Sequence, residues 1–229
     1  AAWLENLSLG FLWHPTAALI VGGGTLGAVV VRRGGSGVFK AFAAVWNLQL
    51  KDESEESHKV EIARLAWLSR SALSNGSKTY ESYADKTEDT LIAKGLTLVA
   101  DSADSKQIEE VLKRRIDHEK SLELEEISTL EAAGAFAPTF GILGAVLGLI
   151  SVLRVLDQPG VLGAGISAAF VATIYGIGLA NLVFFPVASR LRARKEKYIK
   201  RREEIAAVII ALGEKETPRR IINQFNLRQ

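Results

Sequence analysis

Cysteine is absent from this sequence of 229 residues, and so is methionine. Without cysteine the chain can form no disulfide, no thiolate metal site and no cysteine nucleophile. Because an initiator methionine is missing, we expect the true N-terminus to lie upstream of Ala1. The first residues also lack the pattern of a cleavable signal peptide, because Glu5 interrupts them and the apolar run that follows is too long.

Charged residues are missing from three long stretches, although they make up 24% of the chain. Asp, Glu, Lys and Arg are absent from Asn6–Val31, Ala132–Leu153 and Gln158–Ser189. Each stretch is longer than the roughly 20 residues that a helix needs to cross the hydrocarbon core. The sequence therefore predicts an all-α integral membrane protein with three spans, of which the last two form a hairpin, Ala132–Ser189.

Basic residues at the ends of these stretches predict the orientation of the chain. Arg32 and Arg33 close the first stretch and Arg190 opens a basic run after the last, whereas Arg154 in the hairpin turn is offset by Asp157. Since Lys and Arg gather on the cytoplasmic side, we expect the turn outside and the other polar parts inside. A basic run directly after a span is the usual mark of a cytoplasmic flank, so no nucleic-acid partner is expected.

This orientation divides the chain into four predicted regions. They are residues 1–33, a span with an outer flank; 34–131, a cytoplasmic helical domain with long helices rising into the membrane; 132–189, the membrane hairpin; and 190–229, cytoplasmic C-terminal helices.

Helical signals continue through the polar regions. Val38–Leu73 has apolar residues at helical spacing, and Gly76 follows it as part of a stop signal. Asp104 resembles the first residue of a capping box, which predicts a long helix that continues without a break into the second span. The last span is expected to extend to Gly213, and Thr217-Pro218 to start a short terminal helix.

Small residues recur along both helices of the hairpin. They are Ala137, Gly141, Gly144, Ala145 and Gly148 on the first helix, and Ala168, Ala172, Gly176 and Ala180 on the second. Such stripes allow helix backbones to approach closely in lipid. Two interpretations stay open: the stripes only pack the two helices together, or some of their residues face another protein's helix or a narrow ion path.

Thr173 is the strongest polar candidate within the spans. A lone Thr hydroxyl often does no more than bond the carbonyl one turn back. Thr173, however, shares a narrow side of its helix with Ala169, Gly176 and Ala180. On the preceding helix, Pro138 and Ala145 lie two turns apart on one face.

The spans contain no charged residue that could carry an ion. Ion and proton carriers usually need such a group at membrane depth, despite its cost of about 3 kcal/mol or more. If this protein conducts ions, the titratable group must therefore come from a partner helix. No metal or enzyme site is predicted either, because His14, His58 and His118 lack metal-ligand spacing.

Three membrane segments carry a family resemblance in their order and spacing. They are His14–Ala28 (HPTAALIVGGGTLGA), Ala137–Leu149 (APTFGILGAVLGL) and Ala169–Leu182 (AFVATIYGIGLANL). Together they resemble MotA, the stator subunit of the bacterial flagellar motor, within the MotA/TolQ/ExbB proton-channel superfamily. The resemblance implies four membrane helices, of which the first has no counterpart here, and a bacterial inner-membrane homopentamer around two MotB helices. It also implies that MotB supplies the Asp that carries the ion.

The resemblance assigns residues to an ion pathway and to a rotor contact. The ion-pathway residues are Pro138, Ala145, Thr173, Tyr175 and Pro186. Sodium-driven relatives tend to have a hydroxyl at the position of Ala145, so protons are expected as the coupling ion and sodium is less favoured; no other cofactor is expected.

The implied cytoplasmic partner is the rotor protein FliG. Gly76–Glu81 matches the stretch that ends in the family's rotor-contacting Glu. The family's Arg ahead of it falls on Leu73, and Arg70, nearly one turn earlier, is expected to substitute. Without the resemblance, Arg70 and Glu81 would be interpreted as part of a solvated helix face.

Two alternatives stay open. An ExbB-like or TolQ-like energiser of outer-membrane work has three spans with the N-terminus outside, the topology predicted for the sequence as given. Tyr175–Asn181 and Gly22–Thr25 resemble MotA instead. A passive membrane scaffold would use the small-residue stripes only to assemble a complex.

Overall fold

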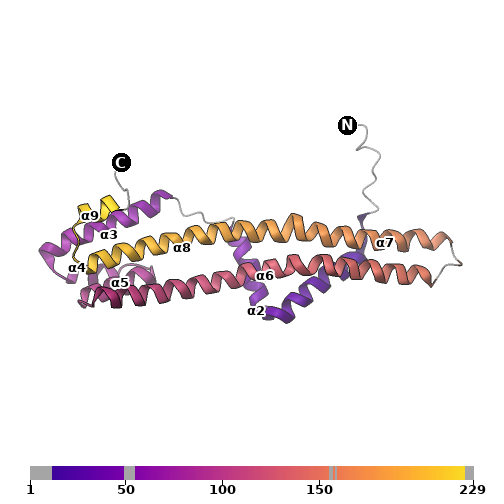
Figure 1. The fold of residues 1–229 in the computed structure, drawn as a ribbon, viewed down its shortest axis with the longest axis horizontal. Helices are drawn as coiled ribbons and strands as arrows, with labels where there is room; N and C mark the ends of the chain where they lie inside the picture. Colours follow the sequence, from indigo (N-terminus) through magenta and orange to yellow (C-terminus); the bar gives the residue numbers. More distant parts are fainter. Residues whose placement is uncertain (1–11, 49–54, 155–156, 158, 225–229) are drawn as a thin grey trace, which may run out of the picture. The chain divides into compact units, whose positions relative to one another are not determined.

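The computed structural model describes residues 12–48, 55–154, 157 and 159–224, and these residues form helices joined by short turns (Figure 1). Three helical stretches within them are long and apolar enough to cross a membrane: Pro15–Trp46, Ser105–Leu153 and Leu162–Gly213. The predicted class, an all-α protein with three spans, is confirmed.

The chain divides into two compact units, which we call the membrane unit and the polar unit. The membrane unit consists of Ala1–Leu48 and Leu124–Arg192, and the polar unit consists of Gln49–Glu123 and Ala193–Gln229. Helices α6 (Ser105–Leu153) and α8 (Phe185–Gly213) each contribute residues to both units.

The first span is interrupted by a bend. It begins with α1 (Pro15–Ala18), widens into a π-helical turn, η2 (Leu19–Gly23), and continues as α2 (Gly24–Leu48). Gly34, directly after Arg32 and Arg33, has φ 75° and ψ 157°, a backbone conformation that favours glycine because it has no Cβ. Figure 1 shows that α2 bends sharply, and the non-helical torsion angles of Gly34 account for this bend.

The hairpin consists of two helices that run past their prolines. Helix α6 is continuous from the polar unit through Pro138 to Leu153, as the sequence predicted. The second helix of the hairpin begins as α7 (Pro159–Gly178), passes through a second π-helical turn, η3 (Leu179–Phe184), and continues as α8. The π turn ends two residues before Pro186, which has no N–H for a helical bond. Within the turn, the Asn181 side chain donates to the Ile177 carbonyl at 3.0 Å.

In the polar unit, four further helices pack against the parts of α6 and α8 that belong to this unit. These are α3 (Glu55–Asn75), α4 (Lys78–Ala84), α5 (Thr90–Ala100) and α9 (Pro218–Gln224). Their buried core includes Ile62, Leu65, Leu91, Leu96, Ile108, Leu112, Ile209, Leu212 and Ile221. The predicted ends at Gly76, which has φ 71°, and Gly213 are confirmed, whereas α5 as a separate helix was not predicted.

Candidate functional site

The backbones of α6 and α7 touch where two glycines cross. A Cβ at Gly176 would lie 2.6 Å from the Ala137 carbonyl oxygen and 3.0 Å from the Gly141 Cα. A Cβ at Gly141 would lie 3.0 Å from the Ala172 carbonyl oxygen. Because these neighbours are backbone atoms, neither position has room for a side chain. Gly141 and Gly176 therefore pack the two hairpin helices against each other.

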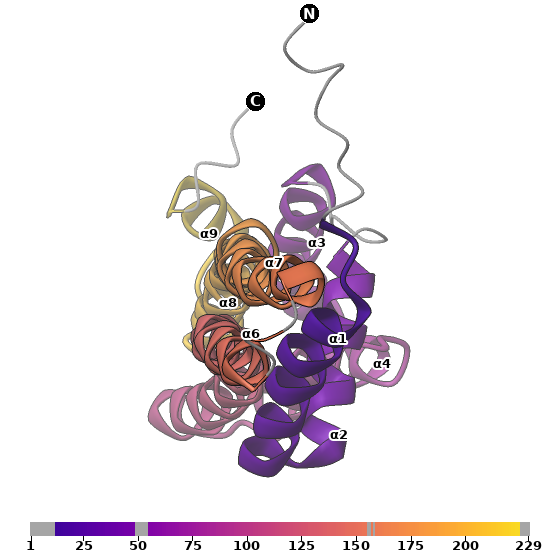
Figure 2. The ribbon, with the colours of Figure 1, turned by 90° about the vertical axis from the view of Figure 1, so that its right-hand side faces the viewer.

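The first span packs over this crossing. A Cβ at Gly144 would lie 2.9 Å from the Ala172 Cβ and 3.4 Å from Ile20 Cγ2. Ala17 and Val21 are buried together with Val171 and Ala172 of α7. Figure 2 shows α1 beside the hairpin in the end-on view. The three spans thus form one packed group within the membrane unit.

Two of the predicted ion-pathway residues lie at the glycine crossing. The Pro138 Cα would be 3.2 Å from a Cβ at Gly176, and the Thr173 Cα would be 3.4 Å from a Cβ at Gly141. Both side chains are half-buried. The Thr173 hydroxyl donates to the Ala169 carbonyl at 3.4 Å, a long bond that leaves its lone pairs free to accept another donor.

The other three predicted ion-pathway residues are less closely associated with the crossing. Ala145 is half-buried one position after Gly144. The Tyr175 hydroxyl donates to the Leu12 carbonyl and accepts from the His14 backbone N–H, at 3.4 Å for the latter, so Tyr175 ties the start of the first span to α7. Pro186 is exposed on α8, beyond the π turn.

The hairpin provides oxygen atoms but no acid within its spans. From Ala132 to Ser189 the ionisable side chains are Arg154 and Asp157 at the turn and Tyr175. In the first span, Thr25 is 1% exposed, and its hydroxyl has no hydrogen-bond partner among the described residues. Thr25 was noted as a polar residue of the first span but was not assigned to the ion pathway, because a lone Thr in an apolar run usually bonds its own helix.

The two predicted rotor-contact residues lie on neighbouring helices of the polar unit. Arg70 is exposed on α3, with its guanidinium carbon 5.4 Å from the centroid of the Trp67 ring. Glu81 is exposed on α4, which is held to the unit by the buried Tyr80 and Ala84. Leu73, where the resemblance would place an Arg, is 81% exposed, so a side chain there would also be free to reach a partner.

Beside Arg70 the surface of the polar unit is hollowed. The hollow has a volume of about 300 Å³ and is lined by Trp67, Arg70, Thr217, Pro218, Arg219, Ile222 and Asn223.

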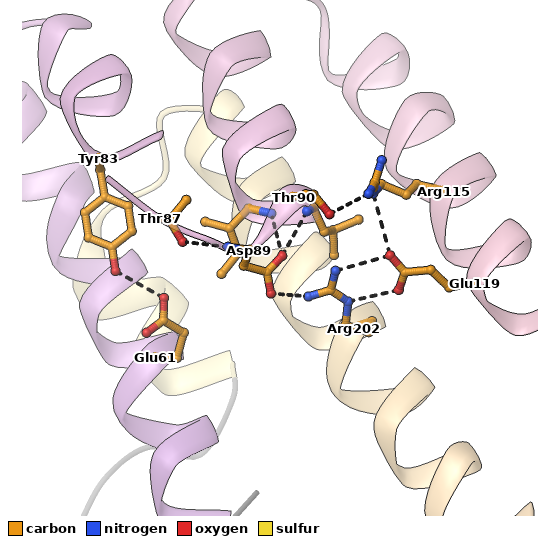
Figure 3. Close-up of polar contacts among 10 residues, drawn as sticks. Glu61, Tyr83, Thr87, Asp89, Thr90, Arg115, Glu119 and Arg202 are labelled. Atoms are coloured by element: carbon orange, nitrogen blue, oxygen red, sulfur yellow. Dashed lines mark hydrogen bonds and ion pairs between the residues drawn. The ribbon is translucent and has the colours of Figure 1, made fainter. Parts of the chain in front are cut away.

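A buried ion network holds the polar unit together, and sequence reasoning missed it. Arg202 of α8 is 5% exposed and donates to Asp89 and, at 3.2 Å, to Glu119 of α6 (Figure 3). Asp89 also caps α5 by accepting from the backbone N–H groups of Leu91 and Ile92.

The network fixes the charge state of Arg202. Burial alone would lower the pKa of Arg202, but its bonds to Asp89 and Glu119 outweigh burial and raise it. The signal in the sequence was the position of Arg202 within the buried series Ile199, Ile205, Ala206 and Ile209, at helical spacing.

Three membrane-length helices packed into one group, without an acid in the spans and continued by helices into a polar unit, define an α-helical integral membrane protein. The model of the MotA/TolQ/ExbB proton channel family matches residues 83–204, more than half of the chain. The chain belongs to this family.

Similarity extends beyond the matched region. The chain is 27% identical over 216 residues to motility protein A of Bacillus subtilis, covering 94% of this chain and 80% of that protein. The chain superposes on the structure of C. jejuni MotAB with a TM-score of 0.86 at 25% identity, covering 100% of this chain and 89% of that one. The flagellar MotAB stator complex from Bacillus subtilis gives a TM-score of 0.84 at 26% identity, covering 97% and 87%.

Proposed function

We propose that this chain is an ion-conducting stator subunit of the bacterial flagellar motor, which couples proton flow through a complex with a MotB-type partner to torque on the rotor. The motility protein and the two MotAB structures to which it is similar support a flagellar stator function. They favour this role over the ExbB-like or TolQ-like energiser, a class that the family match alone includes.

The observation that most supports a partner in the ion pathway is that the charge-free stretches contain no acid. The glycine crossing brings Pro138 and Thr173 together without any carboxylate, although an ion carrier needs one. A partner helix that supplies an Asp beside Thr173 would complete the site. Protonation of that Asp would change its fit against Thr173, and a ring of copies, five in the proposed assembly, would step around the partner.

The proposed coupling ion is the proton. Ala145 has no hydroxyl with which to replace a ligand of a dehydrated sodium ion, whereas a proton needs no such shell. The proposed location is the bacterial inner membrane, with the polar unit in the cytoplasm, where Arg70 and Glu81 would contact the rotor protein FliG.

Proton flux tests the proposal directly. The chain is co-expressed with its MotB-type partner, in which the Asp is either intact or replaced by Asn, and the pH change inside vesicles is followed after a voltage step. Flux should require the intact Asp. Equal flux from both would favour the passive scaffold.

Function in cells separates the two energisers. Expression of both chains should restore swimming to a bacterium that lacks its own stator genes. Restoration of energised uptake across the outer membrane instead would assign the ExbB-like or TolQ-like role.

A further inference from the structure

The half of α2 that follows the bend, residues 35–48, exposes a row of aromatic side chains. Phe39, Phe42 and Trp46 lie at helical spacing on one side and are 75%, 49% and 77% exposed. The opposite side holds Ala41, which is buried, and Val45, which packs behind it. We call Phe39, Phe42 and Trp46 the aromatic row. Large aromatic side chains exposed together mark a surface that contacts something other than water.

The buried side of this helix fixes its level along the spans. Ala41 packs against Ile127 and Leu130 of α6 and against Ala188 and Leu191 of α8. On α6 these contacts lie just before Ala132, where the charge-free stretch begins, and on α8 they lie around Ser189, where it ends. The helix is therefore held at the level where both other spans leave the hydrocarbon.

The charges at this level have one sign along α2. Residues 34–48 contain no acid and one charge, Lys40, which is exposed. Arg32 is exposed just before the bend, while Arg33 donates to the Ser128 hydroxyl of α6. On α6 at the same level, Glu131 is paired with Arg192 at 2.7 Å and Glu125 is exposed. Two cations, Arg32 and Lys40, thus accompany the aromatic row.

We propose that residues 35–48 form an interfacial helix that seats the aromatic row in the leaflet at the Arg32 end of the span, with Arg32 and Lys40 binding the phosphates of anionic lipids such as phosphatidylglycerol. Aromatic rings prefer the headgroup level, and a helix with one apolar and one basic face lies in that plane. The bend at Gly34 turns the chain from the span into this helix. The proposal does not depend on which ion the protein carries or whether it carries one.

Trp46 provides a direct probe of this contact. The chain has four tryptophans, and replacing Trp3, Trp13 and Trp67 by Phe leaves Trp46 alone. This variant is reconstituted in vesicles of phosphatidylcholine and phosphatidylglycerol whose acyl chains carry bromine either near the ester carbonyl or near the bilayer centre. Trp46 fluorescence should lose most of its intensity with the shallow bromines, little with the deep ones, and little with aqueous acrylamide.

The matched control is the chain that retains Trp67 alone, because Trp67 is also exposed but belongs to the polar unit. Its fluorescence should be quenched by acrylamide and not by either bromolipid. For Trp46, quenching by acrylamide alone would mean that the row faces water, and quenching by neither agent would mean that protein, such as a second copy, covers it. Either result would overturn the proposal.

Retained lipid tests the two cations. Each Lys or Arg near an anionic surface contributes about 1 kcal/mol, which is about fivefold in binding. Phosphatidylglycerol retained through detergent purification, relative to phosphatidylcholine, should therefore fall about fivefold in each of Arg32→Gln and Lys40→Gln. Lys106→Gln, an exposed lysine of the polar unit, should leave it unchanged. Unchanged retention in all three variants would refute anionic-lipid binding.

Discussion

Gly176 is the residue of the hairpin with the least room for change, because the atoms that surround it are backbone atoms of α6. Gly176→Ala would put a Cβ 2.6 Å from the Ala137 carbonyl oxygen and force the helices apart. We expect a loss of about 1–3 kcal/mol in stability, as for other overpacked sites. Gly178→Ala is the matched control, because no atom lies within 4 Å of its Cβ position. The amount of protein in membranes and the swimming rate report the difference, and equal amounts would contradict the close approach.

Thr173 is the residue whose hydroxyl is expected to hydrogen-bond to the ion-carrying Asp of the partner. Thr173→Val keeps the shape but removes the hydroxyl, and Thr173→Ser keeps the hydroxyl. One hydrogen bond is worth about 1 kcal/mol, so proton flux should fall about fivefold in the Val variant and much less in the Ser variant. Thr139→Val is the control, because the Thr139 hydroxyl donates to the Phe136 carbonyl of its own helix at 2.6 Å, whereas the corresponding Thr173 bond is 3.4 Å long. A flux that follows side-chain volume rather than the hydroxyl would contradict this role.

Arg70 and Glu81 are expected to act on the rotor through charge alone. The double variant Arg70→Glu and Glu81→Arg should therefore lose most of its swimming speed while the protein still accumulates in membranes. The control exchanges Arg114 and Glu110, an exposed pair on α6 that is 2.5 Å apart, for each other's residue. Normal swimming of the Arg70 and Glu81 variant would refute the assignment of these residues.

At the scale of elements, Arg202 joins α8 to α6 and to the start of α5. Arg202→Met leaves Asp89 without its cation and leaves Glu119 with only Arg115 among the described residues, at 3.6 Å. The two carboxylates are half-buried, at 31% and 20% exposed. Breaking such a pair costs about 3 kcal/mol. Arg114→Gln removes an exposed pair of the same kind and should cost less than about 0.5 kcal/mol. Urea unfolding in mild detergent measures both values, and equal losses would show that the Arg202 network contributes no more than a surface pair.

The elements that could be predicted from the sequence are those whose signals are local. The length of α6 followed from continuous apolar spacing between Asp104 and the charge-free stretch, and its interior proline did not end it. Helix α5 was missed because its buried side meets partners far away in the chain, among them Ile209, which would lie 2.8 Å from a Cβ at Gly95.

The candidate site was predictable only in part for a similar reason. Residue types and spacing identified the small-residue stripes, but which carbonyl lies opposite which glycine depends on the register between α6 and α7. Arg202 was missed because its partners lie 113 and 83 positions away. Contacts at such separations have no local signature.

At the scale of the whole molecule, charge separates the chain into parts that meet lipid and parts that meet water. The hairpin has its charges at the turn, and the polar unit has ion pairs across its helices, such as Lys195 with Glu123 at 3.1 Å. Because Lys and Arg stay on the cytoplasmic side, this distribution predicts which end of each span lies on which side of the membrane.

The absence of cysteine makes that orientation testable with single substitutions. Asp157→Cys places a thiol at the hairpin turn, and Lys106→Cys places one on the exposed surface of α6 in the polar unit. In spheroplasts, whose outer membrane is removed and whose inner membrane is intact, a membrane-impermeant maleimide should label Cys at position 157. It should label Cys at position 106 only after the inner membrane is permeabilised. The unsubstituted chain, which should take up no label, is the control. Labelling at position 106 in spheroplasts would mean that the orientation is opposite to the predicted one. Arg70 and Glu81 would then lie on the side of the membrane where they could not contact a cytoplasmic rotor.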